Sequence, residues 1–368
     1  MHHAIHAADR TAVVLISGFD DGAMGAAAIA VHLGVPGAVA VRHTIDPERQ
    51  VLTRIVSDLS GVLEREEINL AHACVSCAIR EDIVPTLERL AAAGRWSAIV
   101  ACLPVAAEAT QVCRVVAFAP QQAPHVRIAA VVTALDGAGV VRDLLGDDLL
   151  DERGLATSRE DRRGVGEVGC SMVEYADLVC LTSVPDPAAR ALLAALARPG
   201  VSVVTDPAAI DVAPLLVGAH RPEEVESWVS EVRREPLPPA PEGVWRLDLR
   251  SDRPFHPLRF ADELVTLGSG PRRSRGCFWL PTRPDAVCAW DGAGGQIGIG
   301  AGQLWGRRPP LTRITVLGLD ADAAARPAIR AAFEASLVTE AELAARGRVW
   351  VETWDGFEPW LGPIQSVA

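Results

Sequence analysis

The sequence contains no lysine. All 35 of its basic residues are arginine, and they stand against 47 acidic residues, which gives a net charge of −12. This balance disfavours a protein that coats nucleic acid nonspecifically, because such binding needs many cationic contacts with phosphates. No ammonium side chain is available to any site in the chain.

Long apolar runs are also lacking. Glycine, proline or charge interrupts each apolar stretch within about a dozen residues, so we expect no segment that spans a bilayer. The first ten residues include His2, His3 and His6 but no apolar core of a signal peptide. Eight cysteines, of which only two lie close together, favour reduced thiols. We therefore expect a cytoplasmic protein.

Two domains are expected from 368 residues, 49% of them hydrophobic. Residues 1–223 alternate apolar strands with helical segments, which predicts a doubly wound α/β domain with a mainly parallel sheet. A proline-rich linker, 224–243, precedes a smaller α+β domain, 244–368. The expected strands are Thr11–Ser17, Ala38–Val41, Ala98–Leu103, Arg127–Thr133, Leu178–Leu181, Val201–Thr205, Val244–Leu249, Gly276–Leu280, Ala286–Trp290 and Arg313–Leu317, and the expected helices are Ala26–Leu33, Ile83–Leu90, Ala188–Ala197 and Pro327–Ser336.

Several segments resemble the CobW family of P-loop GTPases. In the first half these are VVLISGFDDGAMGA, AHACVSCAIREDIVPTLERL, VVTALDG and EYADLVCLTSVPD, and in the second half RPFHPLRF, RSRGCFWLPTRPD, AGGQ and SLVTEAEL. The resemblance implies a P-loop-like first domain and a CobW C-terminal domain. Within the family the chain is most similar to MRF, the ribosome hibernation factor-recruiting group, which shares the CVSC variant and an eroded nucleotide site.

This sequence departs from the phosphate-loop pattern of that family. A Walker A loop, GxxxxGK[ST], uses its lysine on the β and γ phosphates and its hydroxyl on Mg²⁺. Met24 stands at the lysine position and Gly25 at the hydroxyl position, while Asp20 and Asp21 would repel a triphosphate. Gly18, Gly22 and Gly25 could still line an anion-binding turn.

Two further nucleotide motifs are changed. The Glu-x-x-Gly turn of the family is replaced by residues that continue into Pro104-Val105-Ala106, and Glu108 follows too late to serve. The guanine reader, Asn-Lys-x-Asp, is replaced by Thr182-Ser183-Val184-Pro185, with Asp186 one position late. We therefore expect no bound nucleotide and no GTPase activity.

A cysteine pair, Cys74 and Cys77, stands at the family's Cys-x-Cys-Cys, with Ser76 in place of the middle cysteine. A helix beginning there would favour thiolates, with Asp82 as a possible cap and Pro85 tolerated in the first turn. His72 is a possible third ligand, and such a set would make an open Zn²⁺ site. The alternatives are a structural or vestigial pair and a redox pair. The other six cysteines fit small core residues: Cys102, Cys113, Cys170, Cys180, Cys277 and Cys288.

The second domain contains a cluster of arginines in sequence: Arg272, Arg273 and Arg275, with Arg307 and Arg308 further on. A guanidinium can form two hydrogen bonds with one phosphate, so these residues are candidates for contact with ribosomal RNA. A solvated surface is the simpler interpretation. Six tryptophans should mostly build the core of this domain, with one or two as interface anchors: Trp279, Trp290, Trp305, Trp350, Trp354 and Trp360.

Three functions remain open from the sequence. The leading expectation, which the resemblance implies, is a non-hydrolysing adaptor that recruits a hibernation factor to the ribosome under zinc limitation. The second is a zinc-binding metallochaperone of the CobW type that uses Cys74, Cys77 and His72. The third is a residual nucleotide-dependent GTPase.

Overall fold

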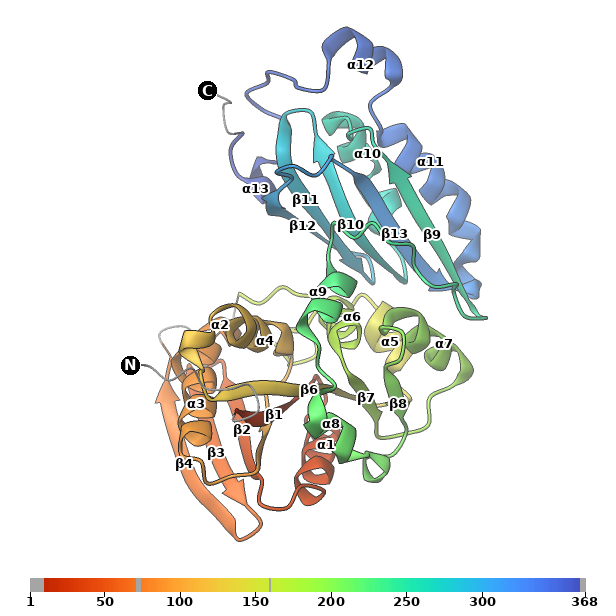
Figure 1. Ribbon diagram of the computed structural model, residues 1–368. Helices are drawn as coiled ribbons and strands as arrows, with labels where there is room; N and C mark the ends of the chain where they lie inside the picture. Colours follow the sequence, from red (N-terminus) through yellow and green to blue (C-terminus); the bar gives the residue numbers. More distant parts are fainter. Residues whose placement is uncertain (1–9, 71–73, 159, 365–368) are drawn as a thin grey trace. The chain divides into compact units, whose positions relative to one another are not determined.

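The computed structural model describes residues 10–70, 74–158 and 160–364 (Figure 1). The chain divides into two compact units, residues 1–143 with 148–228, and residues 144–147 with 229–368. Within the described ranges, no helix is both long and apolar enough to cross a membrane.

The first unit is built on an eight-stranded sheet with the order β4-β3-β2-β5-β1-β6-β7-β8. The six strands from β2 to β8 in that order run parallel, while β3 is antiparallel to both β2 and β4. This confirms the expected mainly parallel sheet. The strands are β1 Thr11–Gly18, β2 Val39–Asp46, β3 Val51–Asp58, β4 Gly61–Asn69, β5 Ala98–Cys102, β6 Val126–Leu135, β7 Leu178–Leu181 and β8 Ser202–Val204.

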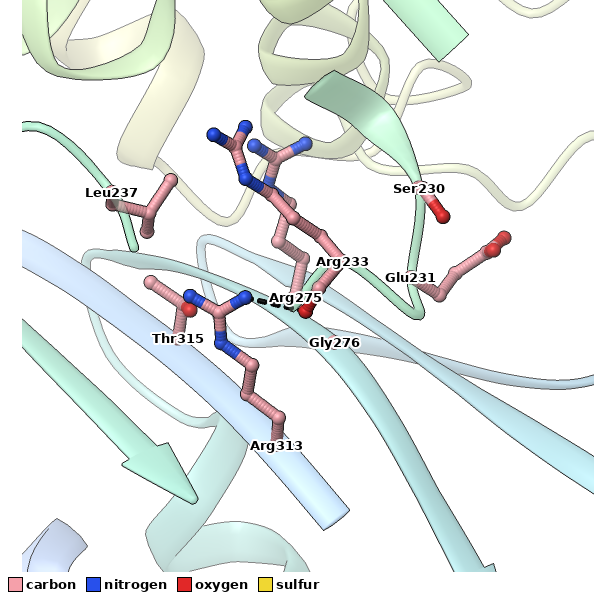
Figure 2. Close-up of a pocket in the computed structure, with 8 residues that line it drawn as sticks. All are labelled: Ser230, Glu231, Arg233, Leu237, Arg275, Gly276, Arg313 and Thr315. Carbon is pink, nitrogen blue, oxygen red and sulfur yellow. Dashed lines mark hydrogen bonds between the residues drawn. The ribbon is translucent and has the colours of Figure 1, made fainter. Parts of the chain in front are cut away.

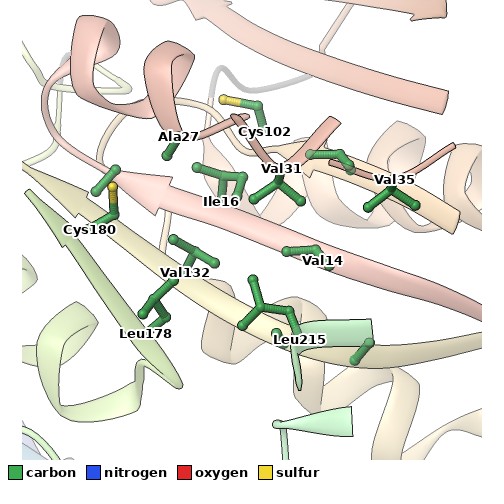
Figure 3. Close-up of a cluster of buried hydrophobic side chains, with 14 of the residues drawn as sticks. Val14, Ile16, Ala27, Val31, Val35, Cys102, Val132, Leu178, Cys180 and Leu215 are labelled. Atoms are coloured by element: carbon green, nitrogen blue, oxygen red, sulfur yellow. The ribbon is translucent and has the colours of Figure 1, made fainter. Parts of the chain in front are cut away.

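Helices cover both faces of this sheet, because the central strands are apolar on both faces. Side chains of β1 such as Val14 and Ile16 share one core with α1 and α8 (Figure 3). The opposite face of the central strands is contacted by α3, α4 and α6 (Figure 1). The helices are α1 Asp21–Leu33, α2 Val75–Ala78, α3 Val84–Ala92, α4 Ala109–Phe118, α5 Val140–Leu145, α6 Val165–Tyr175, α7 Pro187–Leu196, α8 Val212–Gly218 and α9 Pro222–Val229.

The β3–β4 hairpin was not expected from the sequence. Strand β4 reads GVLEREEIN and is mostly exposed, so it lacks the apolar pattern that marks a strand. Its pairing comes from the turn, where the Asp58 carboxylate accepts the Ser60 N–H at 2.7 Å, and from ion pairs such as Arg89–Glu64 at 2.6 Å. Such an edge strand is stabilised by its neighbours rather than by its own burial.

The segment that follows the cysteine pair is a helix interrupted by a π-helical turn. Helix α2 continues through the π turn Ile79–Ile83 into α3. Pro85 lies in the first turn of α3 and has no N–H to donate, which accounts for the irregularity directly before it. Pro85 is therefore tolerated in a first turn, as expected.

Asp82 does not cap this helix, and that expectation was wrong. The side chain points inward and accepts from His43 Nε2 at 2.9 Å, from Arg54 Nη1 and from the Thr86 hydroxyl. Burial alone would raise the pKa of Asp82, but His43 and the Arg54 guanidinium hold it below its usual range. Asp82 thus ties the cysteine-bearing helix to strands β2 and β3.

The second unit is a five-stranded antiparallel sheet with the order β12-β11-β10-β13-β9. Two helices, α10 and α11, pack on one face of it (Figure 1). The core between them holds stacked aromatic rings, with the Phe255 and Phe260 centroids 4.4 Å apart. The elements are β9 Val244–Ser251, α10 Pro257–Gly268, β10 Arg272–Leu280, β11 Arg283–Ala293, β12 Gln296–Leu304, β13 Thr312–Leu319, α11 Arg326–Ser336, α12 Glu340–Arg346 and α13 Glu358–Leu361.

The proline-rich segment before β9 is attached to this sheet. Arginines that alternate with the core residues of β9 and β13 donate to its carbonyl oxygens. Arg313 donates to Arg233 at 2.5 Å, and Arg246 donates to Pro238 at 2.5 Å. The segment is therefore held along the sheet over these residues.

We predict that Asp82→Ala will lower the free energy of unfolding by about 3–5 kcal/mol, because it removes the buried carboxylate that pairs with Arg54 and His43. The measurement is urea unfolding. Since the folded pKa of Asp82 is depressed, its contribution is complete above the unfolded value, near pH 4, and is lost as the pH falls further.

Glu66→Ala is the matched control, because Glu66 pairs with the same Arg54 at 2.5 Å but its side chain is 57% exposed. We expect it to cost less than about 1 kcal/mol. Equal losses from the two substitutions would contradict the role assigned to Asp82.

Candidate functional site

The turn between β1 and α1 is where the resemblance expects a phosphate loop. Helix α1 begins at Asp21, only three residues after the end of β1, so the first turn of the helix takes up most of the expected loop. Asp20 is the N-cap, and its Oδ1 accepts the Ala23 N–H at 2.6 Å. The chain's own carboxylate thus lies at the positive end of the helix, where a phosphate loop places its anion.

The residues expected to line an anion-binding turn lie elsewhere. Gly22 and Gly25 are within α1 rather than in a loop. Met24 is fully buried in the core beneath the sheet, so the position of the Walker lysine faces the interior. Gly18 is the last residue of β1 and packs closely against β6. A Cβ at Gly18 would lie 2.4 Å from the Ala134 carbonyl oxygen. The helix therefore begins about five residues earlier than its apolar pattern predicted.

Asp21 also has a partner within the chain. Its two carboxylate oxygens each accept from Arg42 Nη2 at 2.5 Å, in an exposed pair between the start of α1 and strand β2. Both acids of the turn are thus engaged, one with a backbone N–H and one with a guanidinium.

The turn after β5 lies where the resemblance expects a Glu-x-x-Gly turn, and it contains neither the glutamate nor the glycine. Ala106, at the glycine position, has a φ of +60° and donates its N–H to the Gly18 carbonyl at 2.9 Å. That left-handed conformation is the one glycine adopts without strain. Leu103 stands at the acidic position and is buried. Glu108 instead accepts from the Ser171 hydroxyl and lies 3.6 Å from the Arg163 guanidinium.

The segment at the guanine-reader position is likewise used internally. The Ser183 hydroxyl donates to Asp136 Oδ1 at 2.6 Å, which links the ends of β7 and β6. Asp186 caps α7 by accepting the Ala189 N–H at 2.7 Å. The carboxylate that stood one position late in the sequence is therefore an N-cap.

The cysteine pair lies at the start of α2. Cys74 is the N-cap, and its Sγ accepts the Cys77 N–H at 3.3 Å. Cys74 is partly exposed and Cys77 is buried. The neighbouring sulfur of Cys74, together with burial, raises the pKa of the Cys77 thiol. The helix start therefore brings both sulfurs together, but it does not lower the pKa of Cys77.

The surroundings of the pair are polar on one side. Arg80 Nη2 lies 3.9 Å from Cys77 Sγ, and the Ser76 hydroxyl donates to the Gln111 side chain in α4 at 3.2 Å. His72 lies outside the described residues, as do His2, His3 and His6. Across the residues that are described, no cluster of three or more His, Cys, Asp and Glu side chains could hold a metal ion. The described residues thus place no third such side chain beside the two sulfurs.

The remaining cysteines are core residues, as expected. All six are buried, and burial raises the pKa of Cys102 to about 11 and of Cys277 to about 12. Thiols of this kind stay protonated at neutral pH, which disfavours a role as metal ligands. Four of the six tryptophans are also buried, while Trp354 and Trp360 are exposed.

The five candidate arginines do not form one exposed patch. Arg273 is 2% exposed and pairs with Asp291, and the Arg272 side chain is 11% exposed and pairs with Asp322 at 2.8 Å. Neither can present its guanidinium to an RNA backbone. Arg307 and Arg308 are exposed in the connection from β12 to β13.

Arg275 belongs to a different cluster, which the sequence did not reveal. It lines a hollow in the second unit with Arg233 and Arg313, and the Arg233 and Arg275 guanidinia lie beside one another (Figure 2). Burial and then the charge of Arg275 lower the pKa of Arg233. Arg233 comes from the proline-rich segment and Arg313 from β13, so only the tertiary structure brings them together.

Comparison with known proteins matches both units to family models. The model of the CobW/HypB/UreG nucleotide-binding domain matches residues 51–198. The model of the cobalamin synthesis protein cobW C-terminal domain matches residues 244–337.

Curated relatives agree with these models. A zinc chaperone of Mycobacterium tuberculosis, Rv0106, is 31% identical over 317 residues, which are 80% of this chain and 74% of the relative. An uncharacterized protein of Mycobacterium bovis matches to the same extent. The zinc-regulated GTPase metalloprotein activator 1 of Dictyostelium discoideum is 22% identical over 63% of this chain and 53% of its own.

A solved structure also aligns along most of the chain. The Zn(II)-bound YjiA GTPase from E. coli shares 16% identity over 89% of this chain and 99% of its own, with a TM-score of 0.37 that is too low to argue from. None of these names refers to a ribosome, and the narrower likeness to the MRF group is not supported. The two domain models, matched in order, and the 31% identity to mycobacterial relatives establish that this chain belongs to the CobW family.

Proposed function

We propose that this protein handles zinc as a metallochaperone of the CobW type, with Cys74 and Cys77 holding the ion as cargo. The observation that carries this proposal is the placement of the two sulfurs together at the start of α2, where Cys77 N–H reaches Cys74 Sγ at 3.3 Å. The names of two relatives, a zinc chaperone and a zinc-regulated metalloprotein activator, point in the same direction.

The different burial of the two thiols suits an exchangeable ion. Cys77 is buried in the α2 turn and can anchor one side of the ion, while Cys74 is partly exposed and can be reached by an acceptor. Zinc held by fewer than four protein ligands keeps an open position, whereas a structural site is closed with four. Two cysteines with His72 as a third ligand would form the open kind, and Ser76, bound to Gln111, marks the place of the missing middle cysteine.

We further propose that zinc handling here proceeds without nucleotide hydrolysis. Three features support this proposal: Asp20 takes the N–H at the start of α1, Met24 is buried at the Walker lysine position, and Leu103 replaces the acidic residue after β5. A triphosphate would have to displace the Asp20 carboxylate and approach Asp21 without any cationic partner from a lysine.

The ribosome-recruiting adaptor stays a prediction of the resemblance alone. Neither the relatives nor the geometry of the candidate arginines supports it, since Arg272 and Arg273 pair with acids in the sheet. The zinc-binding alternative has both a pair of adjacent thiols and named relatives in its favour.

We predict that the purified chain will bind about one equivalent of zinc and that Cys74→Ser with Cys77→Ser will abolish this binding. The measurement is zinc content after equilibrium dialysis, by atomic absorption. His2, His3 and His6 are changed to alanine in every sample, so that loose binding by the N-terminal histidines does not contribute.

Ser76→Ala is the matched control, because it changes the same turn without removing a sulfur, and it should keep the zinc. His72→Ala tests the third ligand and should weaken binding. Unchanged zinc content in the double cysteine variant would rule out this site.

We predict that titration with GTP or ATP and Mg²⁺ will give no binding heat in calorimetry, and that Met24→Lys will not restore it. Because Met24 is fully buried, the lysine would place an ammonium in the core and lower the free energy of unfolding by about 3–5 kcal/mol.

Met24→Leu controls for the change of shape and should cost less than about 1.5 kcal/mol. Saturable nucleotide binding by the wild-type chain would refute the nucleotide-independent part of the proposal and leave the zinc site untouched.

A further inference from the structure

A second cavity lies in the first unit at the amino ends of β1 and β6. Its walls include Arg10, directly before β1, and Arg127, the second residue of β6. The turns that replace the nucleotide motifs lie at the carboxyl ends of the same strands. The cavity is therefore separate from the site already described. Its volume is about 360 Å³, which is within the range of small-molecule sites.

His220 lines this cavity, and one of its ring nitrogens has no partner among the described residues. The His220 side chain is 1% exposed, and its Nδ1 lies 2.9 Å from the Asp177 carboxylate. Its Nε2 is buried and has no hydrogen-bond partner in the part of the chain that the structure describes. A buried polar atom without a partner costs free energy, so a ligand that reaches Nε2 would recover it.

The His220 ring is held in this orientation by the Asp177 carboxylate, which is itself fixed by other contacts. Asp177 also accepts the Val131 N–H at 2.8 Å and the Arg198 guanidinium at 2.5 Å, which keeps the carboxylate in place. The backbone N–H of His220 donates to the Ala129 carbonyl at 2.9 Å, which fixes the main chain from which the ring projects. With Nδ1 directed to a carboxylate, Nε2 is the nitrogen left for a ligand.

Two arginine side chains line the cavity and favour an anionic ligand. Arg10 and Arg127 both line it. The Arg10 Nε is buried without a partner among residues 10–70, 74–158 and 160–364, and Arg127 donates to the Leu216 carbonyl at 2.7 Å, a neutral acceptor. Two acids of the first unit are already paired, Asp177 with Arg198 and Glu226 with Arg114. Two guanidinia thus face the cavity in a chain whose net charge is −12.

The rest of the wall is apolar. Val116, Pro120 and Pro222 line it, and burial raises the pKa of the Cys113 thiol, so that this wall residue stays neutral. An apolar wall beside two guanidinia suits a ligand with a charged group and a small apolar body.

We propose that this cavity, the His220 pocket, binds a small organic anion, a carboxylate or phosphate monoester with an apolar body. Its charged group lies between Arg10 and Arg127, its body lies against the apolar wall, and one of its polar atoms forms a hydrogen bond with His220 Nε2. This site is independent of the proposed zinc binding, since it shares no residue with the cysteine pair.

The test uses phenyl phosphate and phenylacetate as probes, with phenylacetamide as the neutral match to phenylacetate. Binding is measured by calorimetry, and the His220 ring resonances are followed by NMR in the same titrations. We expect at least one of the two anions to bind saturably and shift the His220 resonances, and phenylacetamide to bind about tenfold more weakly than its acid. The comparison of the two anions decides between a carboxylate and a phosphate ligand.

Three variants locate the site. His220→Asn keeps a donor for Asp177 but removes Nε2, Arg10→Gln removes a cation, and Ala117→Trp fills the cavity from an exposed position on α4. Each should weaken binding about tenfold or more. Arg162→Gln removes an exposed arginine that pairs with Asp151 outside the pocket, and it should leave binding unchanged.

Arg10→Gln and Ala117→Trp keep the proposal testable if His220→Asn does not fold, because both change partly or fully exposed positions. Failure of both anions to bind would overturn the proposal. Binding that is equal in Arg10→Gln, Ala117→Trp and wild type would overturn it as well.

Discussion

The hydrogen bond from Ala23 N–H to the Asp20 carboxylate is the constraint on which the carboxyl edge of the first sheet depends. It starts α1 at Asp21, and this early start turns what would be a phosphate loop into the first turn of a helix. The same start rotates Met24 into the core and places Asp21 next to Arg42. A single capping aspartate therefore determines which side chains of this region face the interior and which face the solvent.

The backbone around this helix is held by close contacts between the ends of the strands. Ala106 holds a left-handed conformation that suits glycine better, and its N–H still reaches the Gly18 carbonyl. Gly18 itself has no room for a Cβ beside Ala134. Close packing between strand ends fixes such backbone geometry, and packing does not depend on whether a lysine or a glutamate is present.

All basic side chains other than histidine are arginine, and several of their guanidinium groups donate to buried acceptors. Arg54 donates to Asp82 and to the Thr86 hydroxyl from one guanidinium, and Arg283 contacts both oxygens of Asp355. A planar group with several donors can satisfy more than one buried acceptor, which an ammonium on a flexible stem does less well. The cysteine pair rests on one of these networks, because Asp82 links the helix after Cys77 to the neighbouring strands.

The sequence by itself determined the class of fold and most central elements. Apolar runs such as Leu178–Leu181 form strands where they were expected. The changes in the three nucleotide motifs could be read directly from the sequence. The charged β4 strand, the inward turn of Asp82 and the pairing of Arg273 were not visible, because each depends on a partner far along the chain. The His220 pocket likewise joins Arg10, Arg127 and His220 from three separate segments. Local patterns report burial and capping, whereas the partners of a polar side chain are decided by strand order and register, which only the tertiary structure supplies.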